Sequence, residues 1–192
     1  MTPADAVPIV LVHGTRFSAA QWSVQLAALR DEFWVVAVDL PGHGKRWTQP
    51  WSLAGATEII ASAVDSLDRG PALVVGHSLG GYASLEFARR RPESLRGLIL
   101  AGASASTRGL RAVPYRWVAQ LVPHLSAERL TRWNDRLLRR LYPPDVVDAT
   151  IRAHPCARVE LIPRAGHLAN FDDPDAFTDA VRHFARQLPA VD

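Results

Sequence analysis

Short apolar segments without polar alternation recur along this chain of 192 residues, and they constrain its fold more than any other feature. Each segment is four or five residues long and stops at a histidine, an aspartate, a glycine or a proline. Such segments are typical of strands covered on both faces, because neither face then needs polar side chains. We predict five strands, of which only the last includes a charged residue: residues 8–12, 34–38, 72–75, 98–101 and 159–162.

Apolar residues at helical spacing fill the intervals between most of these segments. One stripe covers residues 22–29 after Ser18, a typical N-cap, and a second covers residues 59–67. A third covers residues 177–188, after Asp173-Pro174 as cap and first helical position. Strands that alternate with helices predict an α/β fold with a mostly parallel sheet of about five strands and helices on both faces.

One long stretch, at about residues 106–152, breaks the alternation. It contains no predicted strand, its apolar residues follow helical spacing, and four prolines punctuate it. We therefore predict a single domain, residues 1–192, in which this stretch is inserted as a small helical lid. Its aromatic side chains either line a substrate pocket or pack the lid onto the core.

Composition narrows the class of protein. The net charge is only +3 and no long basic block occurs, so nucleic acid is not an expected partner. No apolar run approaches 18 residues and no signal peptide precedes residue 8, which predicts a cytoplasmic protein without a membrane span. Cys156 is the only cysteine, and no metal-ligand spacing is found, so neither an intrachain disulfide, a metal nor a cofactor is expected.

The candidate for a catalytic residue lies in the segment Gly76-His77-Ser78-Leu79-Gly80. It has the pattern G-x-S-x-G, it follows a predicted strand directly, and a helical stretch begins at Tyr82. In that context the serine hydroxyl stands on a strained turn at a helix N-terminus, where the helix dipole favours developing negative charge. A glycine-rich turn without chemistry is the alternative interpretation.

Four motifs in this order resemble the α/β-hydrolase family, specifically its esterase, lipase and haloperoxidase-like members, from about residue 8 to residue 188. They are the strand into His13-Gly14-Thr15, the segment Asp39–Gly44, the serine turn, and Gly166-His167. The resemblance implies that Asp39 is a turn residue. We expect a structural role for His13.

The resemblance also assigns the candidate site. It implies that Ser78 is the nucleophile and His167 the base that accepts its proton. It implies that the backbone N–H groups of Leu79 and Thr15 form the oxyanion hole, with Arg16 as the next candidate after Thr15.

The acid that should orient the histidine is missing from its usual place. The family's usual first hairpin is absent as well, and so is the strand that commonly carries the acid. Asp145 and Asp148 are the weak candidates nearest the gap, although Pro143-Pro144-Asp145 also fits a helix start. Neighbouring strands are about 4.8 Å apart, so loss of one strand could shift His167 by more than hydrogen-bond reach. We therefore expect activity below that of a complete family member.

These features predict a serine hydrolase that acts on a carboxylic ester, or a related acyl bond, of a small and mostly apolar substrate through an acyl-enzyme at Ser78. Amide, lactone and C–C bond hydrolysis use the same residues and stay open. The alternative is a hydrolase-like binding or scaffold protein with little turnover, and a truncated gene product is a third possibility. The sequence predicts no oligomeric state.

Overall fold

The computed structural model describes residues 5–103, 158, 160–163 and 165–189. The chain divides into two compact units, residues 1–103 together with 169–192, and residues 104–168. The predicted lid and both candidate acids, Asp145 and Asp148, lie outside the described residues. The sheet and the helices described below all belong to the first unit.

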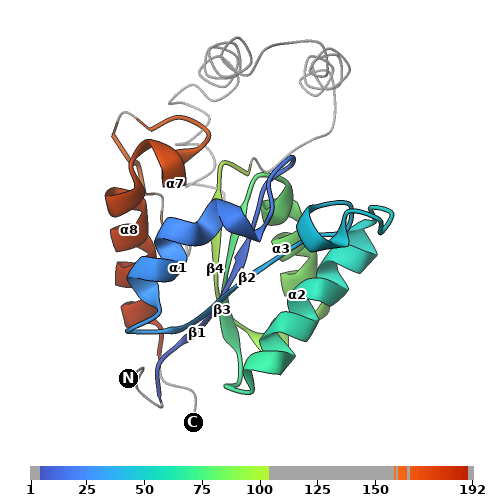
Figure 1. Ribbon diagram of the computed structural model, residues 1–192. Coiled ribbons are helices and arrows are strands. Elements are labelled where there is room, and N and C mark those ends of the chain that lie inside the picture. The colour runs from blue at the N-terminus through green and yellow to red at the C-terminus, as the bar shows by residue number, and fades with distance from the viewer. Residues whose placement is uncertain (1–4, 104–157, 159, 164, 190–192) are drawn as a thin grey trace. The chain divides into compact units, whose positions relative to one another are not determined.

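A parallel sheet with the strand order β2-β1-β3-β4 forms the centre of this unit (Figure 1). The strands are β1 (Pro8–Val12), β2 (Trp34–Val38), β3 (Ala72–His77) and β4 (Leu95–Ala101). Every residue of β1 and β3 is buried, as their uninterrupted apolar sequences predict. The α/β class with a parallel sheet is thus confirmed.

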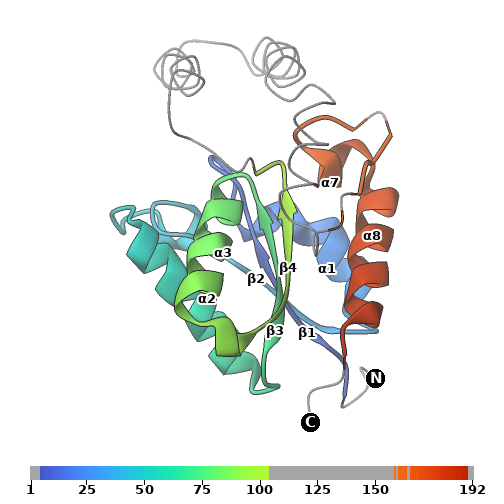
Figure 2. The same cartoon turned by 180° about the vertical axis from the view of Figure 1, so that it is seen from behind.

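Helices cover both faces of the sheet (Figures 1 and 2). On one face lie α2 (Leu53–Leu67) and α3 (Leu79–Arg90), and on the other lie α1 (Ser23–Leu29) and α8 (Pro174–Gln187). A short helix, α7 (Ala169–Asp172), precedes α8. The described residues also include 3-10 turns at Ala19–Trp22, Gly44–Arg46 and Pro92–Ser94.

Asp173 caps α8 as predicted, whereas Ser18 caps the 3-10 turn at Ala19–Trp22 and not the helix α1 that follows it. The Ser18 hydroxyl accepts a hydrogen bond from the N–H of Ala20, and the Asp173 carboxylate accepts one from Ala176. Pro174 occupies the first turn of α8, where a missing N–H costs nothing because that group has no intrahelical acceptor. Local sequence therefore sets where these helices begin.

The strand predicted at residues 159–162 is wrong for the described part of that segment. Residues 160–162 have no strand pairing, and Pro163 lies in a turn. Glu160 interrupts the apolar run, and Pro163 has no N–H to donate to a ladder, so the segment lacks what a central strand requires.

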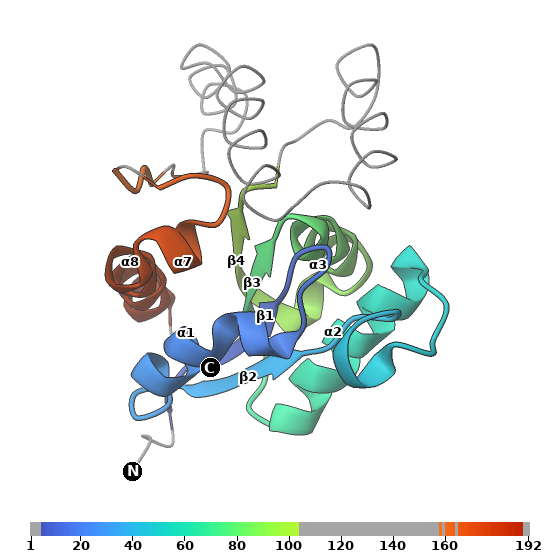
Figure 3. The same ribbon diagram turned by 45° about the horizontal axis from the view of Figure 1, so that its top comes forward.

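Strand order and register bring two loops together. The chain moves from β1 to β2 on one side and returns to place β3 on the other, so the strand order reverses between β1 and β3. In open α/β sheets, ligands bind outside the carboxyl ends of the strands at such a reversal. Because Val12 is aligned with Gly76, the residues after β1 lie beside the residues after β3 (Figure 3).

Of the helices described, none has the length and apolarity needed to cross a bilayer.

Candidate active site

Ser78 occupies a strained turn between β3 and α3. Its φ of 50° and ψ of −113° lie where residues other than glycine rarely occur, at a cost of about 1–3 kcal/mol. The Ser78 N–H donates to the carbonyl of Ala101 in β4 at 2.9 Å, and the Ser78 carbonyl accepts from Gly81 at 2.9 Å as α3 begins. The strand, sharp turn and helix that the G-x-S-x-G pattern predicts are therefore present, and the serine side chain is largely buried.

Two glycines of the pattern allow the close packing around this turn. A Cβ on Gly80 would collide with the carbonyl oxygens of Val12 and His13 in the strand and loop beside it. A Cβ on Gly76 would lie 2.5 Å from the Ser84 hydroxyl and 2.7 Å from the Gly80 carbonyl oxygen. The pattern requires glycine here because α3 starts in contact with β1 and β3.

His13 is fully buried and serves as a structural link, as the sequence predicts. Its Nε2 accepts a hydrogen bond from the N–H of Leu40 at 3.0 Å, so the ring proton is on Nδ1, which lies 2.8 Å from the Gly14 carbonyl oxygen. Burial lowers the pKa of His13 below its ordinary value, since the charged imidazolium would lose its hydration. A neutral imidazole thus joins the loops that follow β1 and β2.

The loop after β1 forms a tight turn beside the serine. The Phe17 N–H donates to the Gly14 carbonyl at 3.3 Å, and Arg16 adopts a φ of 70° at the third position of this turn. A Cβ on Gly14 would lie only 3.3 Å from the Ser78 Cβ, so the turn that carries Thr15 starts against the serine side chain. Leu79 is the first residue of α3, and N–H groups in a first helical turn have no intrahelical acceptor. The structure therefore brings Ser78, Leu79 and the Thr15 turn to one place.

Asp39 lies in the loop after β2, one residue before the turn that the His43 N–H and the Leu40 carbonyl close. Its carboxylate oxygens accept hydrogen bonds from the N–H groups of Ala19 at 2.7 Å and Lys45 at 2.9 Å. Burial by itself would raise the pKa of Asp39, but these two N–H donors and the nearby positive charge of Lys45 hold that pKa below its usual value. Its hydrogen bonds therefore hold together the loops that follow β1 and β2.

His167 belongs to the second unit, where residues 167–168 form a turn shortly after a hydrogen bond from the Ala165 N–H to the Ile162 carbonyl. In sequence it stands two residues before α7 begins. Its assignment as the base, like that of Asp145 or Asp148 as the acid, stays a prediction.

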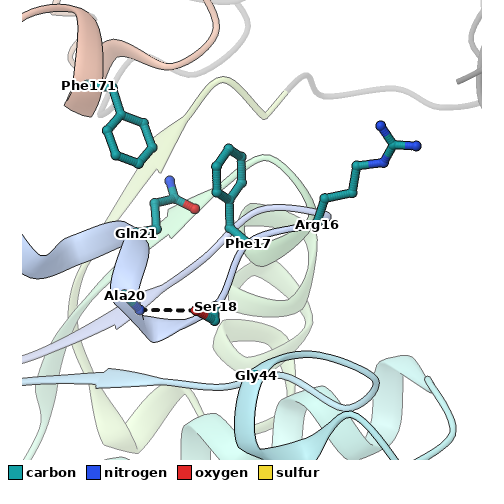
Figure 4. A pocket seen from close by; sticks show the side chains of 7 residues that line it. All are labelled: Arg16, Phe17, Ser18, Ala20, Gln21, Gly44 and Phe171. Carbon is teal, nitrogen blue, oxygen red and sulfur yellow. Dashed lines mark hydrogen bonds between the residues drawn. The ribbon is translucent and has the colours of Figure 1, made fainter. Parts of the chain in front are cut away.

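An open depression of about 470 Å³ lies on the first unit next to the Thr15 turn, and sticks show its lining in Figure 4. The rings of Phe17 and Phe171, 5.6 Å apart between centroids, stand on either side of the Gln21 side chain. The full lining is Arg16, Phe17, Ser18, Ala20, Gln21, Gly44 and Phe171.

The motifs of the sequence do not mark Phe17, Gln21, Asn170 or Phe171. All four stand within four residues of a predicted site residue or cap, and that closeness is the signal that could have found them. Within the described part of the chain, no group of three or more His, Cys, Asp and Glu side chains is arranged to hold a metal ion.

Comparison of the sequence with known proteins finds a lipase and esterases among its relatives. Lipase LipV of Mycobacterium tuberculosis is 31% identical over 110 residues, 57% of this chain and 42% of the lipase. Carboxylesterase YbfK of Bacillus subtilis is 28% identical over 134 residues, 68% of this chain and 45% of the esterase. Pimeloyl-[acyl-carrier protein] methyl ester esterase of Neisseria meningitidis is 35% identical over 103 residues, 53% of this chain and 39% of that enzyme. The chain thus spans less than half the length of these relatives.

Solved structures share the fold. A thermophilic esterase from Thermogutta terrifontis superposes with a TM-score of 0.72 at 24% identity, over 95% of this chain and 90% of the esterase. A bromoperoxidase-like protein, BpoC of M. tuberculosis, gives a TM-score of 0.75 at 19% identity, over 96% of this chain and 94% of its own. Residues 9–153, well over half of the sequence, match the alpha/beta hydrolase family. The chain therefore belongs to the α/β-hydrolase family.

Proposed function

We propose that this protein is a serine hydrolase of carboxylic esters or related acyl bonds, with Ser78 as nucleophile. The observation that carries the proposal is the backbone of Ser78, whose φ of 50° presents the residue at the start of α3 and beside the loop after β1. Such strain persists only where the surrounding structure enforces it, and it is concentrated at functional sites. The lipase and esterase relatives support the same class of reaction.

The proposed reaction has two halves. The Ser78 Oγ attacks the carbonyl carbon of the ester while His167 accepts the hydroxyl proton, and the C–O bond to the alcohol breaks as His167 returns that proton to the leaving oxygen. Water then attacks the acyl-serine with His167 again as base, which releases the carboxylic acid and restores the serine. Neither half needs a cofactor.

The developing oxyanion would be stabilised by the backbone N–H groups of Leu79 and Thr15. Leu79 begins a helix of 12 residues, whose N-terminal dipole favours negative charge. The Thr15 turn starts against the Ser78 side chain, which puts a second backbone donor in the same neighbourhood.

A small and mostly apolar acyl or alcohol group suits the depression beside this turn. The ring faces of Phe17 and Phe171 offer apolar contact there. Asp145 or Asp148 is the proposed acid. If neither orients His167, we expect slower turnover than in a hydrolase with a complete triad.

A fluorophosphonate probe tests the proposal, since it phosphonylates only an activated serine. We expect a single adduct on Ser78, located by mass spectrometry, that is lost in Ser78→Ala and strongly slowed in His167→Ala. His183→Ala, which removes an exposed histidine of α8, is the matched control and should label at the wild-type rate.

The same experiment tests the second candidate function, a binding protein with the hydrolase fold but little turnover. The absence of a strand at residues 160–162, near the place where the family's acid is expected, favours this alternative. Folded wild-type protein that leaves the probe unreacted at Ser78 would support it and contradict the hydrolase proposal.

A further inference from the structure

Two buried side-chain amides link the loop after β1 to helix α7. Gln21 is 3% exposed and Asn170 is 2% exposed, and 149 residues separate them in sequence. The Gln21 Nε2 donates to the Asn170 Oδ1 at 3.2 Å, and the Asn170 Nδ2 donates to the Gln21 backbone carbonyl at 3.2 Å. The Gln21 Oε1 also accepts from the Gly14 N–H at 2.9 Å. Two hydrogen bonds therefore join Gln21 to Asn170, and a third joins the Gln21 side chain to the backbone of Gly14.

Backbone groups fix the orientation of both amides. The Gly14 N–H can only donate, so Oε1 of Gln21 must face it and Nε2 must face Asn170. The Gln21 carbonyl can only accept, so Nδ2 of Asn170 must face that carbonyl and Oδ1 must face Nε2. Rotation of either amide by 180° would oppose donor to donor and acceptor to acceptor in a buried site, which makes the observed arrangement the stable one.

Both the N–H and the carbonyl of Gly14 are hydrogen-bonded, so the peptide groups before and after its Cα are both held. Its N–H is bound by Gln21, and its carbonyl lies 2.8 Å from the His13 Nδ1 and accepts from the Phe17 N–H at 3.3 Å. The Gly14 carbonyl and the Thr15 N–H belong to one planar trans peptide, so they point in opposite directions. Fixing the carbonyl therefore fixes the direction of the Thr15 N–H.

Asn170 in turn is held by Gln25 of helix α1, which also contacts helix α8. The Gln25 Nε2 donates to the Asn170 backbone carbonyl at 3.2 Å and lies 3.4 Å from the Thr178 hydroxyl, which donates to the Pro174 carbonyl at 2.6 Å. In sequence, Asn170 follows His167 by three residues. The amide pair thus joins the candidate oxyanion loop to the helix that follows the candidate base along the chain.

We propose that Gln21 and Asn170 are a positioning pair for the reaction at Ser78. Gln21 fixes the His13–Gly14 peptide through the Gly14 N–H, and this limits the rotation of the adjoining Gly14–Thr15 peptide, whose N–H is directed at the oxyanion. Asn170 fixes the Gln21 amide. This inference rests on the proposed hydrolase function, and it assigns to the pair an effect on the transition state rather than on substrate binding.

The test variant is Gln21→Met, which keeps side-chain length and volume but removes all side-chain hydrogen bonds to Gly14 and Asn170. Thr178→Val is the matched control, because it removes a buried hydroxyl from the same cluster without touching the Gly14 loop.

Hydrolysis of p-nitrophenyl butyrate gives kcat and KM. Binding of n-butylboronic acid gives the affinity for a tetrahedral adduct, in which Ser78 Oγ bonds to boron and a boron-bound oxygen takes the place of the oxyanion.

For Gln21→Met we expect kcat and boronic acid affinity to fall by roughly 10- to 100-fold, with KM changed less than about threefold. The Asn170→Leu variant should show the same pattern, and the double variant should be no worse than Gln21→Met alone, since both residues act through one contact. Gln21→Asn keeps a buried amide and provides a folded variant if Gln21→Met does not fold. Because its side chain is one methylene shorter, Gln21→Asn should also lower kcat. Thr178→Val should lower only the thermal midpoint.

Kinetic constants and boronic acid affinity for Gln21→Met or Gln21→Asn equal to those of Thr178→Val would overturn the positioning role and leave the hydrolase proposal intact. Wild-type protein without a fluorophosphonate adduct on Ser78 would instead overturn the hydrolase proposal and this inference with it. The two failures are therefore distinguishable.

Discussion

The side chains buried on the two faces of the sheet differ in polarity. Beneath α2 and α3 the core is mainly apolar, with Val10, Val74, Ile60 and Phe87 among its buried members. The buried hydroxyls of Thr57 and Ser84 each donate to a backbone carbonyl of their own helix. Between the other face and helices α1, α7 and α8, apolar contacts such as the Trp22–Phe177 ring pair at 5.7 Å occur beside a buried cluster of amides and a hydroxyl, Gln21, Gln25, Asn170 and Thr178. Since buried polar groups stabilise little unless every hydrogen bond is made, we infer that the first face supplies stability and the second holds loops in place.

The largest expected effect is on the apolar face. Phe87→Ala removes a fully buried ring, and we expect the free energy of unfolding to fall by about 3–5 kcal/mol in urea titrations. Leu85→Ala, at an exposed position of the same helix, is the control and should cost less than about 1 kcal/mol. Similar losses for the two variants would contradict the assignment of stability to this face.

Gln25→Met probes the polar face. Two hydrogen bonds donated by Nε2 are lost, but the buried Gln25 Oε1, which has no partner among the described residues, is removed as well. These contributions offset each other, so we expect the free energy of unfolding to change by less than about 1.5 kcal/mol. A loss as large as that of Phe87→Ala would show that the polar cluster is a major source of stability.

His13 follows the last residue of β1. Its burial leads us to predict how the stability of the folded protein depends on pH. Burial depresses its pKa below the ordinary 6.5, so the unfolded chain binds this proton more readily than the folded protein does. Stability is then complete above pH 6.5 and falls as the pH decreases from there toward the depressed pKa. Asp39, whose pKa is also lowered, contributes in a separate range below its ordinary 3.8.

Urea titrations between pH 7.5 and 5 test this expectation. His13→Gln should be less stable than wild type at pH 7.5 but should lose less stability on acidification. A wild-type protein equally stable at pH 7.5 and 5 would contradict the assignment of a neutral, buried His13.

The smallest effect is expected at the outer edge of the polar face. Glu32 forms ion pairs with Arg182 at 2.8 Å and with Arg186, which connect the loop after α1 to α8. Such partly exposed pairs contribute about 0–1 kcal/mol and are screened by salt. Glu32→Gln should therefore lower the thermal midpoint by a few degrees at most, and 1 M NaCl should remove the difference from wild type.

Much of the first unit could be predicted from sequence because its signals are local. The apolar runs at residues 8–12 and 34–38 match β1 and β2 residue for residue, and Asp173 caps the helix that it was predicted to cap. Ser18 caps the 3-10 turn before α1 and not α1 itself. The G-x-S-x-G pattern predicted the turn at Ser78 because its glycines report contacts between adjacent elements.

The rest depends on contacts between distant parts of the chain. No local pattern predicts the burial of Gln21 and Gln25, whose side chains find a partner in Asn170, far along the sequence. The strand predicted at residues 159–162 failed for a related reason, since a short apolar run becomes a strand only when a neighbour accepts its hydrogen bonds.

The bond from the Ser78 N–H to the Ala101 carbonyl has a consequence for how such a chain can diversify. The hydrogen bonds described for the serine backbone are made by residues of the first 103, before the long segment between β4 and α7 begins. That segment can be exchanged, shortened or extended without breaking those bonds. The backbone of the proposed nucleophile is thus held by a stretch of sequence separate from the one that carries His167, Asp145 and Asp148. Changes elsewhere in that second stretch can alter specificity while Ser78 stays in place.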